Sequence, residues 1–341
     1  MPGKRSFEDQ LAALDALRYG PHATAVAPLR KALGHRNNYV VAKAADLVRE
    51  FALAELIPDV LTAFDRFFAD PVKSDPQCWA KNALSRALAG FEHQDAEVFL
   101  RGMRHIQLEP VWGGRSDSAG SLRGTCALAL VQCCGLPEPE LLRHLLELFS
   151  DKDKSVRVEA VRAVEQVGSS SAALLLRLRA ILAAHGPAHD PEGEPEVLGA
   201  CYGGILRLEG KSTIRWIARF LAAGDDISAE AALAIASDRS PEAFSVLRER
   251  FVDDSHSHLS DPASDKWFRS VLLSAIALTR QVEGVDFLLG LVRSESLHAE
   301  AAIEAILRSG PSAETTRQLD NAVSGNARLA RIVAVHREQH S

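Results

Sequence analysis

Two histidine-containing segments have the residue types of a metal site. Imidazole and carboxylate groups are zinc ligands, and they gather in His185-x-x-x-His189-Asp190 and in His256-x-His258 with Asp253, Asp254 and Asp261. A zinc ion needs three or four ligands in a tetrahedral array, and neither segment has a recognised zinc-ligand spacing. The sequence therefore favours two solvated polar loops, and we expect no metal and no cofactor.

Thiol chemistry is the second candidate. The neighbouring cysteines Cys133 and Cys134 could form a redox pair, but no nearby residue would lower a thiol pKa. The chain has 5 cysteines, an odd number without disulfide-framework spacing, which favours reduced thiols and a cytoplasmic location. We expect four of them to be core residues, namely Cys78, Cys126, Cys133 and Cys201. No phosphate-binding loop, nucleophile elbow or carboxylate pair is recognisable, so no catalytic residue is assigned.

Composition sets limits on the function. Of 341 residues, 47 % are hydrophobic and only 6 % aromatic, which suits helices packed through small aliphatic side chains. The formal net charge is −6, whereas proteins that bind phosphate backbones usually carry the opposite sign. The first ten residues do not resemble a secretory signal, and no apolar stretch reaches the length of a membrane span. We expect neither nucleic acid nor a membrane as the partner.

A helix pair is clearest between Pro139 and Gly168. Apolar residues recur at helical spacing from Leu141 to Phe149, and a second apolar stripe runs from Val156 to Val167. Neither predicted helix can bury its stripe alone, so the pair must stack on similar pairs. Looser copies of the second helix start recur at intervals of 31 to 44 residues, with anchors at Val41, Cys78, Leu122, Val156, Val197, Ala229, Phe268 and Ala299.

The phrase Asp153-x-x-Val156-Arg157-x-x-Ala160 resembles the HEAT-repeat family, and the resemblance extends from about Ala23 to Val323. It implies an all-α superhelix, an α-solenoid of about eight to nine helix pairs. Residues 1–341 would form one solenoid, with a cap helix in 1–22 that Ser6 starts and a C-terminal cap in 312–341. One enzyme of this repeat class, deoxyhypusine hydroxylase, binds iron through His-Glu dipeptides, and this sequence has none.

In HEAT repeats the Asp and Arg of this phrase link neighbouring repeats. The resemblance therefore implies an inter-repeat ladder that includes Asp153, Arg157, Arg123 and Arg269. Other copies lack the arginine, so we expect the ladder to be discontinuous.

Loops inside the predicted pairs are often long, at 69–77, 107–120, 185–196 and 252–266. All such loops emerge at one edge of a stacked array, and long loops often carry function; tolerated insertions are the alternative. Trp112 and Arg115 lie in the second loop, and Trp and Arg dominate interaction hot spots. Trp112 could equally fold back onto the helices. Strand signals are nearly absent from the sequence, which has no long alternating Val/Ile/Thr segment and no Asn-Gly hairpin turn.

Stacked second helices should line a concave face, where we expect Lys43, Arg49, Glu159, Arg162 and Tyr202 to be exposed. Such a face suits a peptide or protein, so a non-enzymatic protein–protein interaction scaffold is the leading hypothesis. Alkylpurine DNA glycosylases also resemble HEAT solenoids, and DNA binding is the first alternative. A helper subunit for attaching bilins is the second, since those subunits resemble HEAT arrays too. The sequence indicates no particular oligomeric state.

Overall fold

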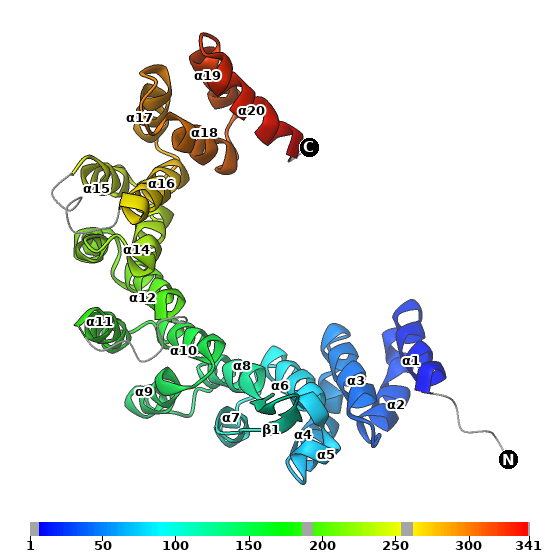
Figure 1. The fold of residues 1–341 in the computed structure, drawn as a ribbon. Coiled ribbons are helices and arrows are strands. Elements are labelled where there is room, and N and C mark those ends of the chain that lie inside the picture. The colour runs from blue at the N-terminus through cyan, green and yellow to red at the C-terminus, as the bar shows by residue number, and fades with distance from the viewer. Residues whose placement is uncertain (1–6, 186–193, 254–261, 340–341) are drawn as a thin grey trace. The chain divides into compact units, whose positions relative to one another are not determined.

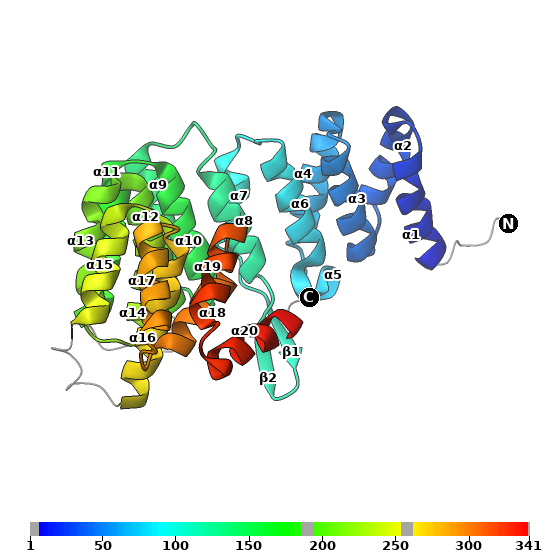
Figure 2. The ribbon, with the colours of Figure 1, turned by 90° about the horizontal axis from the view of Figure 1, so that it is seen from above.

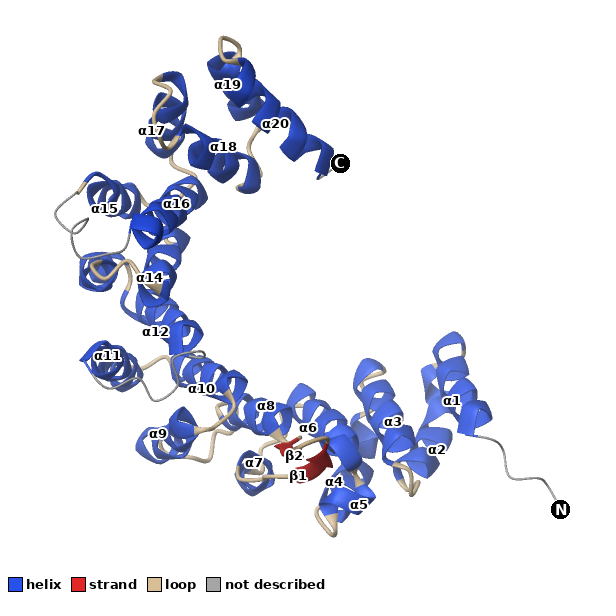
Figure 3. Ribbon diagram, viewed as in Figure 1, coloured by secondary structure: helices blue, strands red, loops and turns tan. Residues whose placement is uncertain are grey.

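The computed structural model describes residues 7–185, 194–253 and 262–339, and their regular secondary structure is helical apart from one small hairpin (Figure 3). Two compact units divide between Val167 and Gly168. No helix in the described part of the chain is long and apolar enough to cross a membrane.

Unit 1, up to Val167, consists of helix pairs that stack side by side. In four pairs a first helix packs on the second helix that follows it, and the second helices α3, α6, α8 and α10 also pack on one another (Figure 1). The α-helices are α1 (Phe7–Asp15), α2 (His22–Leu33), α3 (Asn38–Glu50), α4 (Ile57–Arg66), α5 (Pro71–Ser74), α6 (Trp79–Gly90), α7 (Ala96–Met103), α8 (Gly120–Leu130), α9 (Glu138–Glu147) and α10 (Lys154–Val167). Short 3-10 turns are η1 (Ala16–Tyr19), η2 (Ala54–Leu56), η3 (Pro76–Cys78) and η4 (Leu148–Ser150).

Unit 2, from Gly168, repeats the same arrangement. Its first helices pack on second helices, and α12, α14, α16, α18 and α20 pack on one another in that order. The α-helices are α11 (Ser170–His185), α12 (Glu194–Glu209), α13 (Ile214–Ala218), α14 (Asp226–Ser237), α15 (Pro241–Val252), α16 (Pro262–Leu278), α17 (Val282–Arg293), α18 (Ala299–Arg308), α19 (Ala313–Val323) and α20 (Ala327–Gln339). Short 3-10 turns are η5 (Lys211–Thr213) and η6 (Arg219–Leu221).

Local sequence explains where these helices begin and end. The Asn37 side chain accepts hydrogen bonds from the backbone N–H groups of Tyr39 and Val40 and so caps α3. Helix α10 ends at Gly168, whose φ of 76° lies in the left-handed region that favours glycine. The predicted stop at Gly168 and the predicted N-terminal helix to about Tyr19 are confirmed; Ser6 lies outside the described residues.

The loop between Gln107 and Gly120 contains two short strands that the sequence pattern did not reveal. Strands β1 (Leu108–Val111) and β2 (Gly114–Asp117) form an antiparallel hairpin in which Val111 is opposite Gly114. The two-residue turn is Trp112-Gly113, and Gly113 has a φ of 88°. A Trp-Gly turn is not a strong hairpin signal, so pattern alone did not predict these strands.

The other long loops have different outcomes. The segment 69–77 contains the short helix α5 and the start of η3. Residues 186–193 and 254–261 lie outside the described residues; they include His189, Asp190, Asp254, His256, His258 and Asp261. Among the residues that are described, no group of three or more His, Cys, Asp or Glu side chains could hold a metal ion.

A buried ion pair supports the middle of unit 1. The Nζ atom of Lys81 lies 3.0 Å from Oδ2 of Asp75, and both side chains are 0 % exposed. Lys81 also donates to the carbonyl of Phe67 over 3.2 Å, which joins the end of α4 to α6. Breaking a buried pair leaves an uncompensated charge, which is strongly destabilising.

We therefore expect Lys81→Ala to lower the free energy of unfolding by about 3–5 kcal/mol, measured by urea denaturation of the full chain. Lys73→Ala, which changes an exposed lysine in α5, should change it by less than about 0.5 kcal/mol. The double variant Asp75→Asn/Lys81→Met should recover part of the loss, because it removes both charges. A loss below about 1 kcal/mol in Lys81→Ala would show that the pair is not structurally required.

Candidate functional site

A buried polar network lies at the N-terminal ends of the second helices of unit 1. Its first link runs from α3 to α6, where the Asn38 amide donates to Asp75 Oδ1 over 2.9 Å and to the Pro76 carbonyl over 3.0 Å. The backbone N–H groups of Ala80 and Lys81 donate to the two oxygens of the same carboxylate. Asp75 thus joins two helix pairs and caps α6.

The second link holds the hairpin. The Gln107 amide donates to the Asp75 carbonyl and to Glu109 Oε1, each over 2.7 Å. Glu109 Oε1 also accepts from the Gln77 backbone N–H and from the Ser118 hydroxyl, each over 2.6 Å. Burial acts to raise the pKa of Glu109, but these donors hold it below its usual value. One carboxylate therefore anchors the hairpin to the loop that precedes α6.

The third link centres on Arg123 in α8. Its guanidinium donates to both oxygens of Asp151, over 2.8 Å and 3.0 Å, and lies 2.7 Å from Asp117 Oδ2 at the end of the hairpin. It also donates to the His105 carbonyl over 3.0 Å. Bidentate Arg–carboxylate pairs are strong and directional. Arg123 thus links the end of α7, the hairpin and the next helix pair.

Asp117 is held ionised by the same contacts. Burial acts to raise its pKa, but the backbone N–H groups of Gln107 and Ala119, together with Arg123, hold the pKa of this carboxyl below its usual value.

The expected inter-repeat ladder needs correction in its acidic member. Arg123 pairs with Asp151, whereas Asp153, just before α10, accepts hydrogen bonds from the backbone N–H and hydroxyl of Ser155. Arg157 donates to the Asp151 carbonyl over 2.8 Å, and Arg269 donates to the Phe251 carbonyl over 2.8 Å and to Asp265 over 2.9 Å. One contact is common to Arg123, Arg157 and Arg269. Each donates to a backbone carbonyl at the end of the first helix of its own pair, or just after it.

Exposed apolar side chains occur in and beside the hairpin that this network holds. Trp112 at its tip is 103 % exposed, so it does not fold back onto the helices. Three further apolar side chains around it are also exposed, namely Ile106, Leu108 and Val111. Arg115 is exposed on β2, opposite Pro110. Figure 2 shows the hairpin projecting beyond the ends of α6 and α8.

Other predicted binding residues of unit 1 lie on α3 and α10. Lys43 pairs with Asp15 over 3.2 Å, and Arg162 pairs with Glu159 over 2.7 Å, so these three positions are largely neutralised within the chain. Arg49 differs, because its side chain makes no hydrogen bond or ion pair with the described residues.

Arg49 borders a groove of about 360 Å³ over the second helices of unit 1. Small residues form its floor, and the polar rim is Arg49, Arg86, Thr125, Gln132 and Gln166. Arg86 is engaged with Asp46 over 3.2 Å. The groove offers a guanidinium, a hydroxyl and two amides, which suits a carboxylate with neighbouring hydrogen-bonding groups. It lies apart from the hairpin, whose residues do not line it.

The expected exposure of Tyr202 is wrong. Its side chain is 0 % exposed within α12, and its ring packs on Phe220 at a centroid distance of 5.0 Å. Burial raises the pKa of its hydroxyl, which has no hydrogen-bond partner among the described residues. Tyr202 is therefore a core residue of unit 2, and it cannot contact a ligand on the surface of α12.

The sequence analysis did not identify most residues of this buried polar network. An aspartate precedes a basic residue by six positions in three successive pairs, Asp75/Lys81, Asp117/Arg123 and Asp151/Arg157. This spacing was available in the sequence, but it does not coincide with the HEAT-like phrase used to align the repeats.

The Arg123–Asp151 contact can be measured by a double-mutant cycle of Arg123→Ala and Asp151→Ala. We expect a coupling of about 2 kcal/mol in the free energy of unfolding, because both side chains are nearly buried. The same cycle with Arg101 and Asp65, an exposed pair at 2.7 Å, should give at most about 1 kcal/mol. Equal coupling in the two cycles would contradict the structural role of Arg123.

The cysteines match their predicted placement. Cys78, Cys126, Cys133 and Cys201 are buried, Cys134 is exposed, and all five are free thiols. Burial raises the pKa of the Cys78 thiol to about 11 and that of Cys201 to about 12, and it raises the pKa of Cys126 and Cys133 as well. These four thiols stay protonated near neutral pH and are poor nucleophiles.

We expect iodoacetamide to label the native chain near neutral pH at Cys134, with little labelling of the other four thiols, as mapped by peptide mass spectrometry. Cys134→Ser should remove the native labelling, and unfolding in urea should expose all thiols. Rapid native labelling of Cys78 or Cys201 would contradict their burial.

Comparison with known proteins finds neither a family model nor a curated protein that matches this chain.

Proposed function

We propose that the chain is an α-solenoid of HEAT-like helix pairs that acts as a non-enzymatic protein–protein interaction scaffold. The pairwise packing of first on second helices, repeated through both units, supports this architecture. We include a cytoplasmic location in the proposal, because all five cysteines are free thiols.

The exposure of the Trp112 side chain is the main support for this proposal. A wholly exposed tryptophan presents a large apolar area to water, and such residues are the commonest hot spots of protein interfaces. Its strand neighbours extend the apolar surface, and Arg115 adds a polar group at its rim. The partner should therefore offer an apolar pocket that admits an indole ring, bordered by a hydrogen-bond acceptor for Arg115.

The network beneath the hairpin favours recognition rather than a tolerated insertion. Gln107, Glu109 and Asp117 fix the hairpin to Asp75, Gln77 and Ala119 of unit 1 through hydrogen bonds of 2.6–3.0 Å. Trp112 is presented in a defined position before a partner arrives, which reduces the entropy lost on binding. The Arg49 groove lies on the same unit and can take an acidic segment of the same partner.

A comparison of Trp112→Ala with Tyr19→Ala tests this function. Both rings are exposed, Tyr19 by 92 %, but Tyr19 lies in η1, away from the hairpin. Partners captured under native conditions by the tagged full chain would be identified by cross-linking and mass spectrometry, and their affinities titrated for each variant. We expect Trp112→Ala to weaken binding about 30-fold or more and Tyr19→Ala to leave it unchanged.

Neither variant should unfold the chain, because neither ring is buried, and thermal denaturation checks this point. Retention of every partner by Trp112→Ala would rule out the hairpin as the contact. Failure of the wild-type chain to retain any stable partner would count against the scaffold itself.

A further inference from the structure

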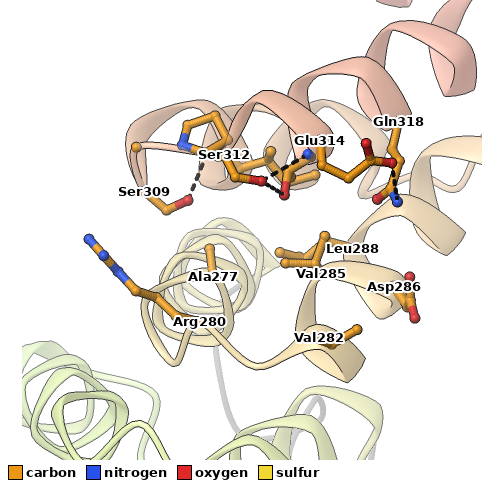
Figure 4. A pocket seen from close by; sticks show the side chains of 14 residues that line it. Ala277, Arg280, Val282, Val285, Asp286, Leu288, Ser309, Ser312, Glu314 and Gln318 are labelled. Atoms are coloured by element: carbon orange, nitrogen blue, oxygen red, sulfur yellow. Dashed lines mark hydrogen bonds between the residues drawn. The ribbon is translucent and has the colours of Figure 1, made fainter.

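Unit 2 contains a groove between two successive first helices, α17 and α19 (Figure 4). Its volume is about 450 Å³, within the usual range of ligand sites. The ends of α16 and α18 close it from below. It belongs to a different unit from the hairpin and shares no residue with that surface.

The floor of the groove is apolar. Ala277, Leu288 and Ile306 are buried beneath it, and Val285 is partly buried beside them. Val282 at the margin is 73 % exposed. An aliphatic side chain placed here would remove apolar surface from water on both molecules.

Unpaired opposite charges lie at the two ends. Figure 4 shows the Arg280 guanidinium at one end and the Asp286 carboxylate at the other. Neither side chain makes an ion pair or hydrogen bond with the residues that the structure describes. Glu314 also lines the groove, but it is engaged with Arg317 and Gln318. The groove therefore has one available cation and one available anion, separated by an apolar floor.

We propose that this groove binds an extended peptide segment in which an acidic and a basic side chain flank an aliphatic one. The ammonium and carboxylate of a single amino acid share one carbon and cannot reach both ends. In an extended chain every second side chain points the same way, so an acid–x–aliphatic–x–base spacing turns all three toward the groove.

The charges at the two ends of the groove set the direction in which the peptide binds. The acidic side chain of the peptide meets Arg280, its aliphatic side chain lies on Val285 and Leu288, and its basic side chain meets Asp286. Direct charge pairs at an exposed rim contribute modestly, so selectivity should be a few-fold and sensitive to salt. This site stands independently of the hairpin.

Four fluorescein-labelled peptides in low-salt buffer test the proposal by anisotropy with the full chain. The first peptide has the mixed-charge core Glu-Ser-Leu-Ser-Lys. Two further peptides have Glu or Lys at both ends of this core, and in the fourth the leucine is replaced by serine. The wild-type chain should bind the mixed-charge peptide about three to five times more tightly than either like-charge peptide. The serine peptide should bind more weakly still, because it lacks the aliphatic contact.

Single charge reversals should change the preference in a defined direction. Arg280→Glu makes both ends acidic and should select the Lys/Lys peptide, whereas Asp286→Lys makes both ends basic and should select the Glu/Glu peptide. Arg293→Glu is the matched control, since it makes the same charge change on an exposed residue of α17 that does not line the groove. It should keep the mixed-charge preference.

These outcomes test peptide binding in the groove independently of Trp112. Binding that follows the charge reversals, and persists in Trp112→Ala, supports the groove even if the hairpin has no partner. Absence of saturable binding by the wild-type chain, or a preference that Arg280→Glu leaves unchanged, overturns the proposal.

Discussion

The side chains of Asp75 and Lys81 are both fully buried, and contacts from several elements of unit 1 stabilise these paired charges. A carboxylate in this position needs several donors, and it receives them from Asn38 of the preceding pair, from the first backbone N–H groups of α6 and from Lys81. The ammonium group in turn needs an acceptor, which the end of α4 supplies. The requirement that buried charges be satisfied therefore fixes how neighbouring helix pairs meet.

The hairpin depends on the same requirement. Its strands contain Glu109 and Asp117, whose carboxylates accept hydrogen bonds from the loop before α6 and from the start of α8. An isolated two-stranded hairpin is marginally stable in water. Here these polar contacts replace the packing that a larger sheet would provide, so the apolar side chains of the hairpin need not be buried. Exposure of Trp112 is thus a consequence of how the hairpin is anchored.

Sequence patterns predicted the helices well because amphipathic spacing is local and repeats along the chain. The apolar stripes of α9 and α10, the stop at Gly168 and the buried cysteines all follow from it. The hairpin could not be predicted from such patterns, because its stability comes from contacts of Gln77, Gln107 and Arg123 rather than from strand propensity. Tyr202 was misplaced for a related reason: its position on a second helix suggested the concave face, whereas Phe220 of the next pair packs against its ring. Asp153 was assigned to the ladder because it opens the HEAT-like phrase, whereas the contact of Arg123 is with Asp151, two residues earlier.

Both units contain charges that are already paired within the chain, such as Arg123 with Asp151 in unit 1 and Arg269 with Asp265 in unit 2. The charges at the ends of the groove in unit 2 differ from these. Arg280 lies just before α17 and Asp286 lies within α17, and the two form no ion pair with each other. A charge that already has a partner contributes to folding but adds little to binding, because its existing contact must be broken first. Unpaired charges beside an apolar floor impose no such cost, and for that reason the groove of unit 2 is suited to selecting a ligand by charge.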